Sequence, residues 1–327
     1  MSSSVIDLAK RAGNQAVNIN KPTGTDFHIN SRGSDWFFSA MCVFIVITGL
    51  LIVLMFRKPV NERVFYYTAI APNLFMIINY FTLASDLGWA PVKAKYNHFR
   101  TADQKTVPGT RQIFYARYIG WFCAMPWPII QMGLISTTPW PQTIFNVAMT
   151  EVYVICMLIG SVVHSTYKWG YMGFGMAASY IACTSLMTTS RNLAIKLGKD
   201  VFTFFEVSMG IIMSIWFIYP VCFGVSEGGN AISPDATGIW YGILDLIWLS
   251  FLPAGVAVVA AANFSLDRLQ LTKAPAVAPA ALPASRSMSS IASAKSAKSA
   301  KSAKSAKSAK SAKSTKSKKS KGKKSKK

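Results

Sequence analysis

The stretch "TGIWYGILDLIWLSFLPAGVAVVAAANFS" (residues 237–265) is long enough to cross a membrane as one helix and carries a single charge, Asp245. A bilayer core about 30 Å thick needs about 20 apolar residues of helix. With this stretch the sequence contains seven such runs: Trp36–Phe56, Val64–Ser85, Tyr118–Trp140, Thr143–Val163, Trp169–Thr189, Val207–Ser226 and Thr237–Ser265. We therefore expect an all-α membrane protein, a bundle of seven transmembrane helices over residues 35–265.

The composition supports this class and argues against metal chemistry. Hydrophobic residues make up 51% of the 327 residues and charged residues only 15%, which is too apolar for an ordinary soluble domain. The five cysteines all lie inside predicted spans and show no C-x-x-C pairing, whereas the three histidines lie outside the spans. Disulfides and metal sites are not expected. Residues 1–34 are polar and lack the apolar core of a signal peptide, so they are predicted to form an extracellular tail.

The net charge of +22 is concentrated at the C-terminus. Fifteen of the 35 basic residues lie in Lys295–Lys327, where an Ala-Lys-Ser triplet repeats. Such a sequence has too little apolar surface to fold, so residues 266–327 are predicted to be a disordered linker and cytoplasmic tail. Next to a membrane, the tail is expected to bind anionic lipids or an acidic protein. The alternative is a merely solvated tail, and nucleic acid is not an expected partner.

Charge also predicts the orientation of the bundle. An odd number of spans places the termini on opposite sides, and the positive-inside tendency makes the lysine-rich end cytoplasmic and the N-terminus external. The basic loops at 57–63 and 190–200 agree with this orientation, but the basic loop at 91–111 opposes it.

Charged residues inside the spans are the first candidates for a functional site, because an ionisable group in a membrane helix costs at least about 2.5 kcal/mol. We expect an internal ion pair between Arg117 and Asp245, with outward snorkelling of Arg117 as the alternative. Glu151, the other acid well inside a span, is expected to be protonated and hydrogen-bonded to a neighbouring helix. Glu206 and Glu227 are expected at the two membrane interfaces, with Glu227 facing the exterior.

Several ordered motifs resemble one family. "RYIGW" (117–121) with Pro126, "WFIYPVCFGVSEGG" (216–229) and "YGILD" (241–245) resemble the third, sixth and seventh helices of microbial rhodopsins, and "STYKWGYMGFG" (165–175) resembles their fungal branch. The resemblance covers roughly residues 35–265 and implies a seven-helix bundle of the microbial rhodopsin type. It also implies a vestigial retinal pocket, although ordinary core packing is the alternative for its aromatic members: Trp121, Phe174, Trp216, Tyr219, Asp245 and Leu249.

The same resemblance exposes three departures from photochemistry. In the family a lysine four residues after the seventh-helix aspartate carries retinal as a Schiff base, and this chain has Leu249 there. The proton acceptor and donor positions of the pumps are matched by Gly120 and Gln131. Leucine has no amine and glutamine does not exchange a proton near neutral pH. Covalent retinal is therefore not expected as a cofactor.

This pattern resembles the fungal opsin-related, heat-shock-protein-30-like subgroup that lacks the retinal lysine. The resemblance implies a stress-linked protein of the plasma membrane that acts through partners or lipids and restrains, in some accounts, the proton-pumping ATPase. No nucleophile–base pair or metal-ligand spacing indicates an enzyme. Two alternatives stay open: a receptor that binds an apolar, retinoid-like ligand without a covalent bond, and passive ion or proton transport along Arg117, Asp245 and Glu151.

Overall fold

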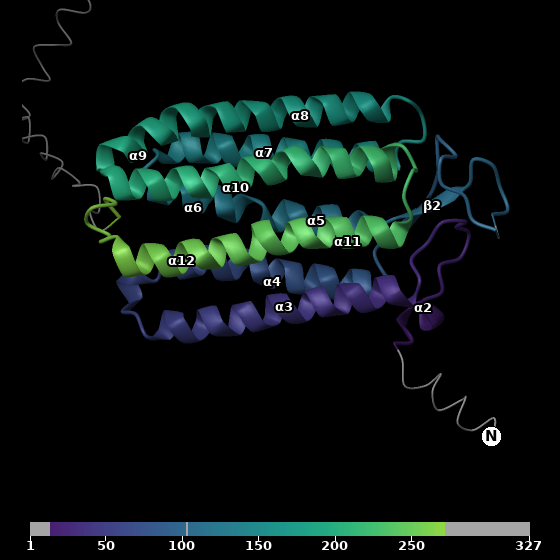
Figure 1. The fold of residues 1–327 in the computed structure, drawn as a ribbon, viewed down its shortest axis with the longest axis horizontal. Coiled ribbons are helices and arrows are strands. Elements are labelled where there is room, and N and C mark those ends of the chain that lie inside the picture. Colours follow the sequence, from purple (N-terminus) through teal and green to yellow (C-terminus); the bar gives the residue numbers. More distant parts are fainter. Residues whose placement is uncertain (1–13, 103, 272–327) are drawn as a thin grey trace, which may run out of the picture. The chain divides into compact units, whose positions relative to one another are not determined.

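Seven long helical rods run alongside one another in the computed structural model, which describes residues 14–102 and 104–271 (Figure 1). The Lys-rich tail and most of the predicted linker lie outside the described residues. The rods are α3 (Ser31–Phe56), α4 (Val64–Ala84), α5 (Tyr115–Ala124) with α6 (Pro126–Ile135), α7 (Trp140–Val162), α8 (Lys168–Ser185) with α9 (Arg191–Leu197), α10 (Lys199–Phe223), and α11 (Pro234–Asp245) with α12 (Leu252–Asn263).

Three of these rods contain a turn of π-helix. These turns are η2 (Leu186–Ser190) before α9, η3 (Gly224–Gly228) after α10, and η4 (Leu246–Phe251) between α11 and α12. Among the described residues, six rods are long and apolar enough to cross a membrane by length and composition alone, and the α8–α9 rod completes the bundle. The contacts close the rods into a ring. Each rod packs on the next, α3 on α4, α4 on α5, α6 on α7, α7 on α8, α8 on α10 and α10 on α11, and α11 packs back on α3. The seven predicted spans are confirmed as the seven rods.

Helix boundaries differ from the predicted spans where polar residues continue a helix beyond its apolar part. The first rod begins at Ser31, because the side chain of Asn30 caps it by accepting hydrogen bonds from the backbone N–H groups of Arg32 and Gly33. The predicted loop at 190–200 is wrong. Residues Arg191–Leu197 form α9, and only Gly198, with φ of 119°, separates it from α10.

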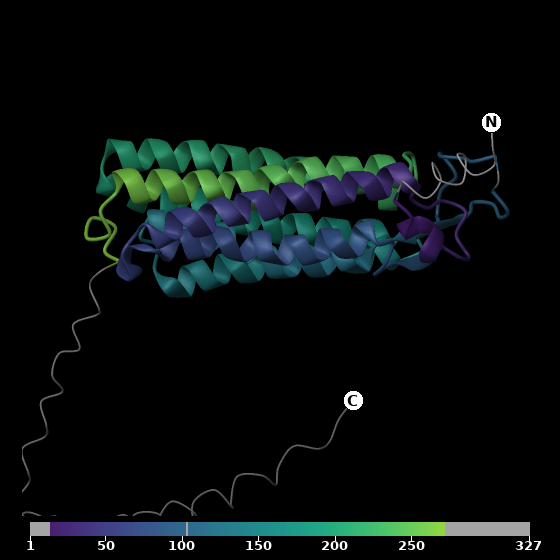
Figure 2. The ribbon, with the colours of Figure 1, turned by 90° about the horizontal axis from the view of Figure 1, so that it is seen from below.

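One end of the bundle is covered by α2 (Ala16–Ile19) and an antiparallel hairpin of β1 (Ala90–Lys93) and β2 (Thr110–Ile113). Both views place these elements beyond the same end of the rods (Figures 1 and 2). Part of the predicted N-terminal tail is packed here, because Phe27 is 1% exposed and Ile29 is fully buried. The backbone N–H of Ile29 donates to the side chain of Gln112 over 2.9 Å, which joins this segment to β2.

The other end of the bundle is closed by the residues that follow α12. Leu269 is fully buried, and Arg268 forms an ion pair of 2.5 Å with Asp200 at the start of α10. The predicted boundary at residue 266 is therefore too early, since the described residues 266–271 fold back onto the bundle.

Candidate functional site

Asp245, the last residue of α11, lies at the centre of the bundle and is fully buried. Its carboxylate accepts hydrogen bonds from three aromatic side chains on three other rods. The Tyr80 hydroxyl donates over 2.7 Å, the Trp121 indole N–H over 2.8 Å and the Tyr219 hydroxyl over 2.5 Å. Hydrogen bonds to a charged acceptor are the strong ones, so the three donors stabilise a carboxylate that the apolar core would otherwise disfavour.

The predicted ion pair between Arg117 and Asp245 is wrong. The Arg117 guanidinium forms its ion pair with Glu227, with 3.3 Å between Nη1 and Oε1, and its Cζ lies 4.8 Å from the centre of the Tyr241 ring. Glu227 is only 5% exposed, so the expectation that it lies at a membrane interface and has no part in the site is also wrong. The physical reason is local, because the π-helical turn η3 carries Glu227 into the bundle, where Ser226 and Tyr241 also donate to its Oε2.

Two further buried cations, Lys168 and Arg111, lie at this end of the bundle, and neither was among the predicted site residues. Lys168, the first residue of α8, is 2% exposed and donates from Nζ to the backbone oxygen of Glu227 over 2.7 Å. Arg111 on β2 is 3% exposed and donates to Asn230 and Thr237 over 2.8 Å each. Arg111 stands in the basic loop 91–111 and Lys168 directly before the fifth predicted span, where a cation is ordinarily expected to be solvated.

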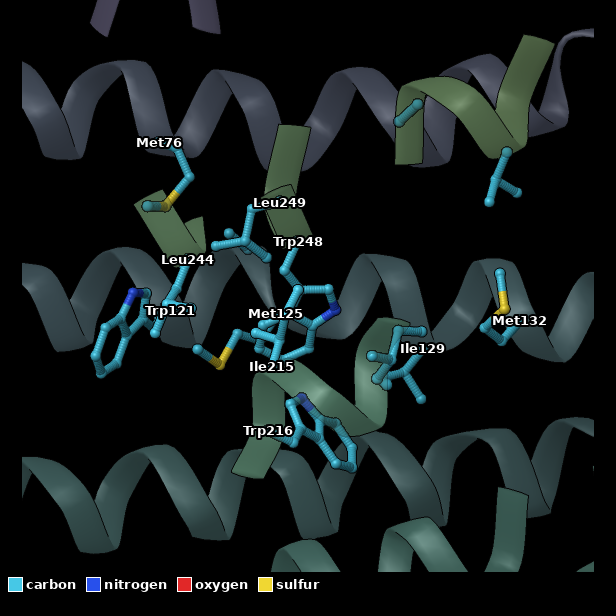
Figure 3. Close-up of a cluster of buried hydrophobic side chains, with 14 of the residues drawn as sticks. Met76, Trp121, Met125, Ile129, Met132, Ile215, Trp216, Leu244, Trp248 and Leu249 are labelled. Carbon is cyan, nitrogen blue, oxygen red and sulfur yellow. The ribbon is translucent and has the colours of Figure 1, made fainter. Parts of the chain in front are cut away.

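The aromatic residues around Asp245 pack directly against one another. The Trp121 ring centre lies 5.1 Å from that of Tyr219, and the Trp248 ring centre lies 5.6 Å from that of Trp216 and 5.9 Å from that of Tyr219. Figure 3 shows the Trp248 indole among Met125, Ile215 and Trp216.

Most of the expected pocket residues do meet at this place. Trp121, Tyr219, Asp245 and Leu249 are fully buried, and Trp216 is 6% exposed. Phe174 is the exception and its predicted place in the pocket is wrong. It is 68% exposed on α8, since it lies on the outer, membrane-facing side of that helix.

Comparisons with known proteins agree with this arrangement. The family model described as "Bacteriorhodopsin-like protein" matches residues 32–248. This chain belongs to the bacteriorhodopsin-like family. Protein YRO2 of Saccharomyces cerevisiae is 56% identical over 82% of this chain and 78% of its own length. The 30 kDa heat shock protein of the same yeast is 33% identical over 79% of this chain and 82% of its own length.

Solved structures of the family share the fold. The light-driven proton pump LR (Mac) from Leptosphaeria maculans aligns with a TM-score of 0.67 at 22% identity, covering 74% of this chain and 98% of that one. The predicted seven-helix bundle of microbial rhodopsin type is therefore confirmed, as is the membership among fungal opsin-related membrane proteins.

Position 249, where the resemblance predicts the chromophore lysine in other members of the bacteriorhodopsin-like family, is occupied by a fully buried leucine. It lies in the π-helical turn η4, and its backbone oxygen accepts a hydrogen bond of 3.3 Å from Asn73. The preceding residue, Trp248, is also fully buried and directs its indole into the centre of the aromatic cluster. No sequence motif had identified Trp248 as part of this site.

The acceptor and donor positions of the pumps are filled in different ways. At Gly120, an added Cβ would lie 2.5 Å from Cγ of Asn79, so the Asn79 amide occupies the space that a side chain at 120 would need. Gln131 is fully buried and donates from Nε2 to the backbone oxygens of Phe65 and Pro253 over 3.4 and 3.2 Å. A neutral amide therefore lies at each position, that of Asn79 beside Gly120 and that of Gln131 itself.

Glu151 on α7 does not form the hydrogen bond expected for it. Both of its carboxylate oxygens are buried and neither has a partner among the described residues. It interacts electrostatically with Cys123 on α5, and no hydrogen bond or ion pair among the described residues joins it to Arg117 or Asp245.

Proposed function

We propose that this chain is a light-independent, opsin-related protein of the plasma membrane with a stress-linked role, acting through partners or lipids and without enzymatic activity. The N-terminus lies outside and the lysine-rich end lies in the cytoplasm. The name of the 30 kDa heat shock protein supports the link to stress, because that relative covers most of this chain.

The observation that carries this proposal is the packing around Leu249. The residue has no amine, and Trp248 beside it occupies the middle of the aromatic cluster, in contact distance of Trp216 and Tyr219. Asp245 is held by Tyr80, Trp121 and Tyr219, so it needs no Schiff-base cation as a counter-charge. A covalently bound chromophore would need an amine and open space at this place, and the leucine at 249 and the buried Trp248 indole beside it support the proposal that none is bound.

Reconstitution with all-trans retinal tests the proposal. The unmodified protein and the Leu249→Lys variant should show no visible absorption band, because the first lacks the amine and the second keeps the Trp248 indole in the way. The double variant Trp248→Ala/Leu249→Lys should acquire a band, while Trp248→Ala alone should not. A band in the unmodified protein would overturn the proposal, and a band in Leu249→Lys alone would overturn the part assigned to Trp248.

The two alternative functions gain no support from the site. A receptor for an apolar ligand needs space between Trp121, Trp216 and Tyr219, but Trp121 packs on Tyr219, and both Tyr219 and Trp216 pack on Trp248. Passive transport needs a polar path along the whole bundle, but in the half towards α9 the buried Gln131 side chain donates only to the backbone oxygens of Phe65 and Pro253.

The partner part of the proposal concerns the proton-pumping ATPase of the membrane and the Lys295–Lys327 tail, which lies outside the described residues. Deleting this tail should weaken binding of the purified protein to vesicles rich in anionic lipid, more strongly at low than at high salt, because screening reduces the attraction. Binding that is equal with and without the tail would contradict a role in lipid attachment. Purification of the tagged full chain tests the ATPase as a partner. The ATPase should co-purify with the tagged chain and not with an untagged control.

A further inference from the structure

Residues 27–29 of the N-terminal segment form a short clasp that is tied to β2 of the hairpin. The backbone N–H of Phe27 donates to the Thr110 oxygen over 3.0 Å, and the backbone N–H of Gln112 donates to the Phe27 oxygen over 2.8 Å. Phe27 is 1% exposed and Ile29 is fully buried. The clasp is therefore packed into the end of the bundle and not merely laid over it.

The clasp is linked to a buried carboxyl group through one side chain of β2. Oε1 of Gln112 accepts the backbone N–H of Ile29 over 2.9 Å, and its Nε2 donates to Oδ1 of Asp86. Asp86 is 1% exposed, and its Oδ2 has no hydrogen-bond partner among the described residues. A single amide thus connects the clasp to a carboxyl group that has one donor for its two oxygens.

The turn after α4 fixes the position of Asp86. Its φ is 57°, in the left-handed region that Asp adopts more readily than most residues. Its backbone oxygen accepts the Trp89 indole N–H over 2.9 Å, and its backbone N–H donates to the Leu83 oxygen over 3.1 Å. Since this turn is held on α4, the carboxyl group meets water most directly when the clasp and the Gln112 side chain move away from it.

The charged groups around Asp86 offer little compensation for a negative charge. His28 of the clasp acts on Asp86 through its charge, but His28 is exposed, and solvent screening weakens such an attraction. Asp235 at the start of α11 competes for the same charge of His28. Arg111, the neighbour of Gln112 on β2, donates to other partners.

Protonation of Asp86 therefore favours the closed clasp. A neutral carboxyl group is buried at lower cost than a carboxylate. Burial raises the pKa of Asp86 from 3.8 to about 6, although the hydrogen bond from Gln112 and the charge of His28 oppose this. The contribution of the proton to closure is complete below about pH 4 and is lost as pH rises through about 6.

We propose that residues 27–29 act as a proton-sensitive clasp, which stays closed on β2 while Asp86 is protonated and opens when this carboxyl group ionises. Opening uncovers Arg111, which is 3% exposed and whose backbone pairs with that of Phe27. The clasp goes beyond the proposed function and is independent of it, because retinal reconstitution and clasp opening report on different parts of the bundle.

Hydrogen–deuterium exchange of the full-length protein in lipid nanodiscs tests the clasp, read by mass spectrometry on peptides that cover residues 24–30. The exchange rate of the unmodified protein is divided by that of Asp86→Asn at the same pH. The intrinsic pH dependence of exchange cancels in this ratio, because the peptide is identical in both proteins. The ratio should rise about three- to tenfold from pH 5 to pH 7, and the upper value applies if opening restores the ordinary pKa of Asp86.

Three further variants separate Asp86 from its neighbours. Asp35→Asn removes an exposed acid of α3, and it should keep the rise of the ratio with pH. His28→Gln should keep the rise as well, since His28 only modulates Asp86. Gln112→Leu removes the link between Asp86 and Ile29, and it should speed exchange of residues 24–30 at both pH values.

Several outcomes would overturn the proposal. One is a ratio that is equal at pH 5 and pH 7 or falls as pH rises. Another is loss of the pH dependence in His28→Gln together with its persistence in Asp86→Asn. An equal rise in peptides from the interior of α4 would assign the effect to unfolding of the bundle. If Asp86→Asn does not fold, a synthetic peptide of residues 24–30 is the reference, and the same rise is measured on the unmodified protein alone.

Discussion

The two halves of the bundle interior differ in how they bury polar groups. Towards the hairpin, Arg117, Glu227 and Asp245 are 5% exposed or less, and each is paired or accepts several hydrogen bonds. Towards α9, the core is apolar and its polar members are neutral, such as Gln131 with its long hydrogen bonds. In the hairpin half, buried charges are thus offset by hydrogen bonds or by an opposite charge.

The largest effect is expected from breaking the ion pair of the hairpin half. Glu227→Leu leaves the Arg117 guanidinium buried without a counter-ion, and the free energy of unfolding should fall by about 3–5 kcal/mol. Unfolding of the purified protein in mixed micelles by increasing SDS measures this. The double variant Arg117→Met/Glu227→Leu is the control and should recover most of the loss. If the single and double variants are equally unstable, the pair is not the source of the effect.

Acidity should affect the hairpin half through Asp86, which follows α4 and lies outside the spans. Burial raises the pKa of Asp86 from 3.8 to about 6, and the hydrogen bond from Gln112 and the charge of His28 oppose this. The folded state therefore binds the proton more tightly than the unfolded state, and stability should fall by about 3 kcal/mol as pH rises from about 4 to about 6.

Asp86→Asn is the test of this pH dependence. Since the amide does not titrate, the variant should lose the decline in unfolding free energy over that pH interval and be more stable than the unmodified protein at pH 7. The same decline in both proteins would assign the pH dependence to other groups.

A smaller effect is expected at the centre, where the two halves meet. Asp245→Asn keeps the shape of the side chain but removes the charge that accepts from Tyr80, Trp121 and Tyr219. The weaker hydrogen bonds should lower the unfolding free energy by about 2 kcal/mol. Tryptophan fluorescence should report the changed environment of the Trp121 indole. Unaltered stability together with unaltered fluorescence would contradict the role assigned to the carboxylate.

The smallest effect is expected in the half towards α9. Gln131→Leu removes two hydrogen bonds of 3.2 and 3.4 Å but also removes the Oε1 atom, which has no partner among the described residues. These changes oppose each other, so the unfolding free energy should change by less than about 1 kcal/mol. A loss as large as that of Glu227→Leu would remove the distinction between the two halves.

Much of the site follows from local patterns in the sequence. The four-residue spacing between Asp245 and position 249 marks one place on one helix, and Leu249 by itself excludes a Schiff base there. Trp121 and Tyr219 are also found from motifs, because their spacing from Arg117 and Trp216 is a property of single helices.

Sequence reasoning failed where the direction of a side chain depends on how rods pack or on an irregular turn of the backbone. Phe174 belongs to a recognised motif, but which side of α8 faces the membrane is decided by how that rod packs on α7. The partner of Arg117 depends on the η3 turn, which carries Glu227 inward, and the burial of Lys168 depends on the same backbone.

The sequence by itself determined that this chain crosses the membrane as seven helices, because the length and apolar composition of a span depend only on neighbouring residues. It also determined that position 249 offers no amine. Only the tertiary structure decided that Trp248 fills the centre of the bundle, that Glu227 and not Asp245 pairs with Arg117, and that Asn79 occupies the space beside Gly120. These are contacts between rods distant in sequence, and the geometry of their packing selects which side chains meet.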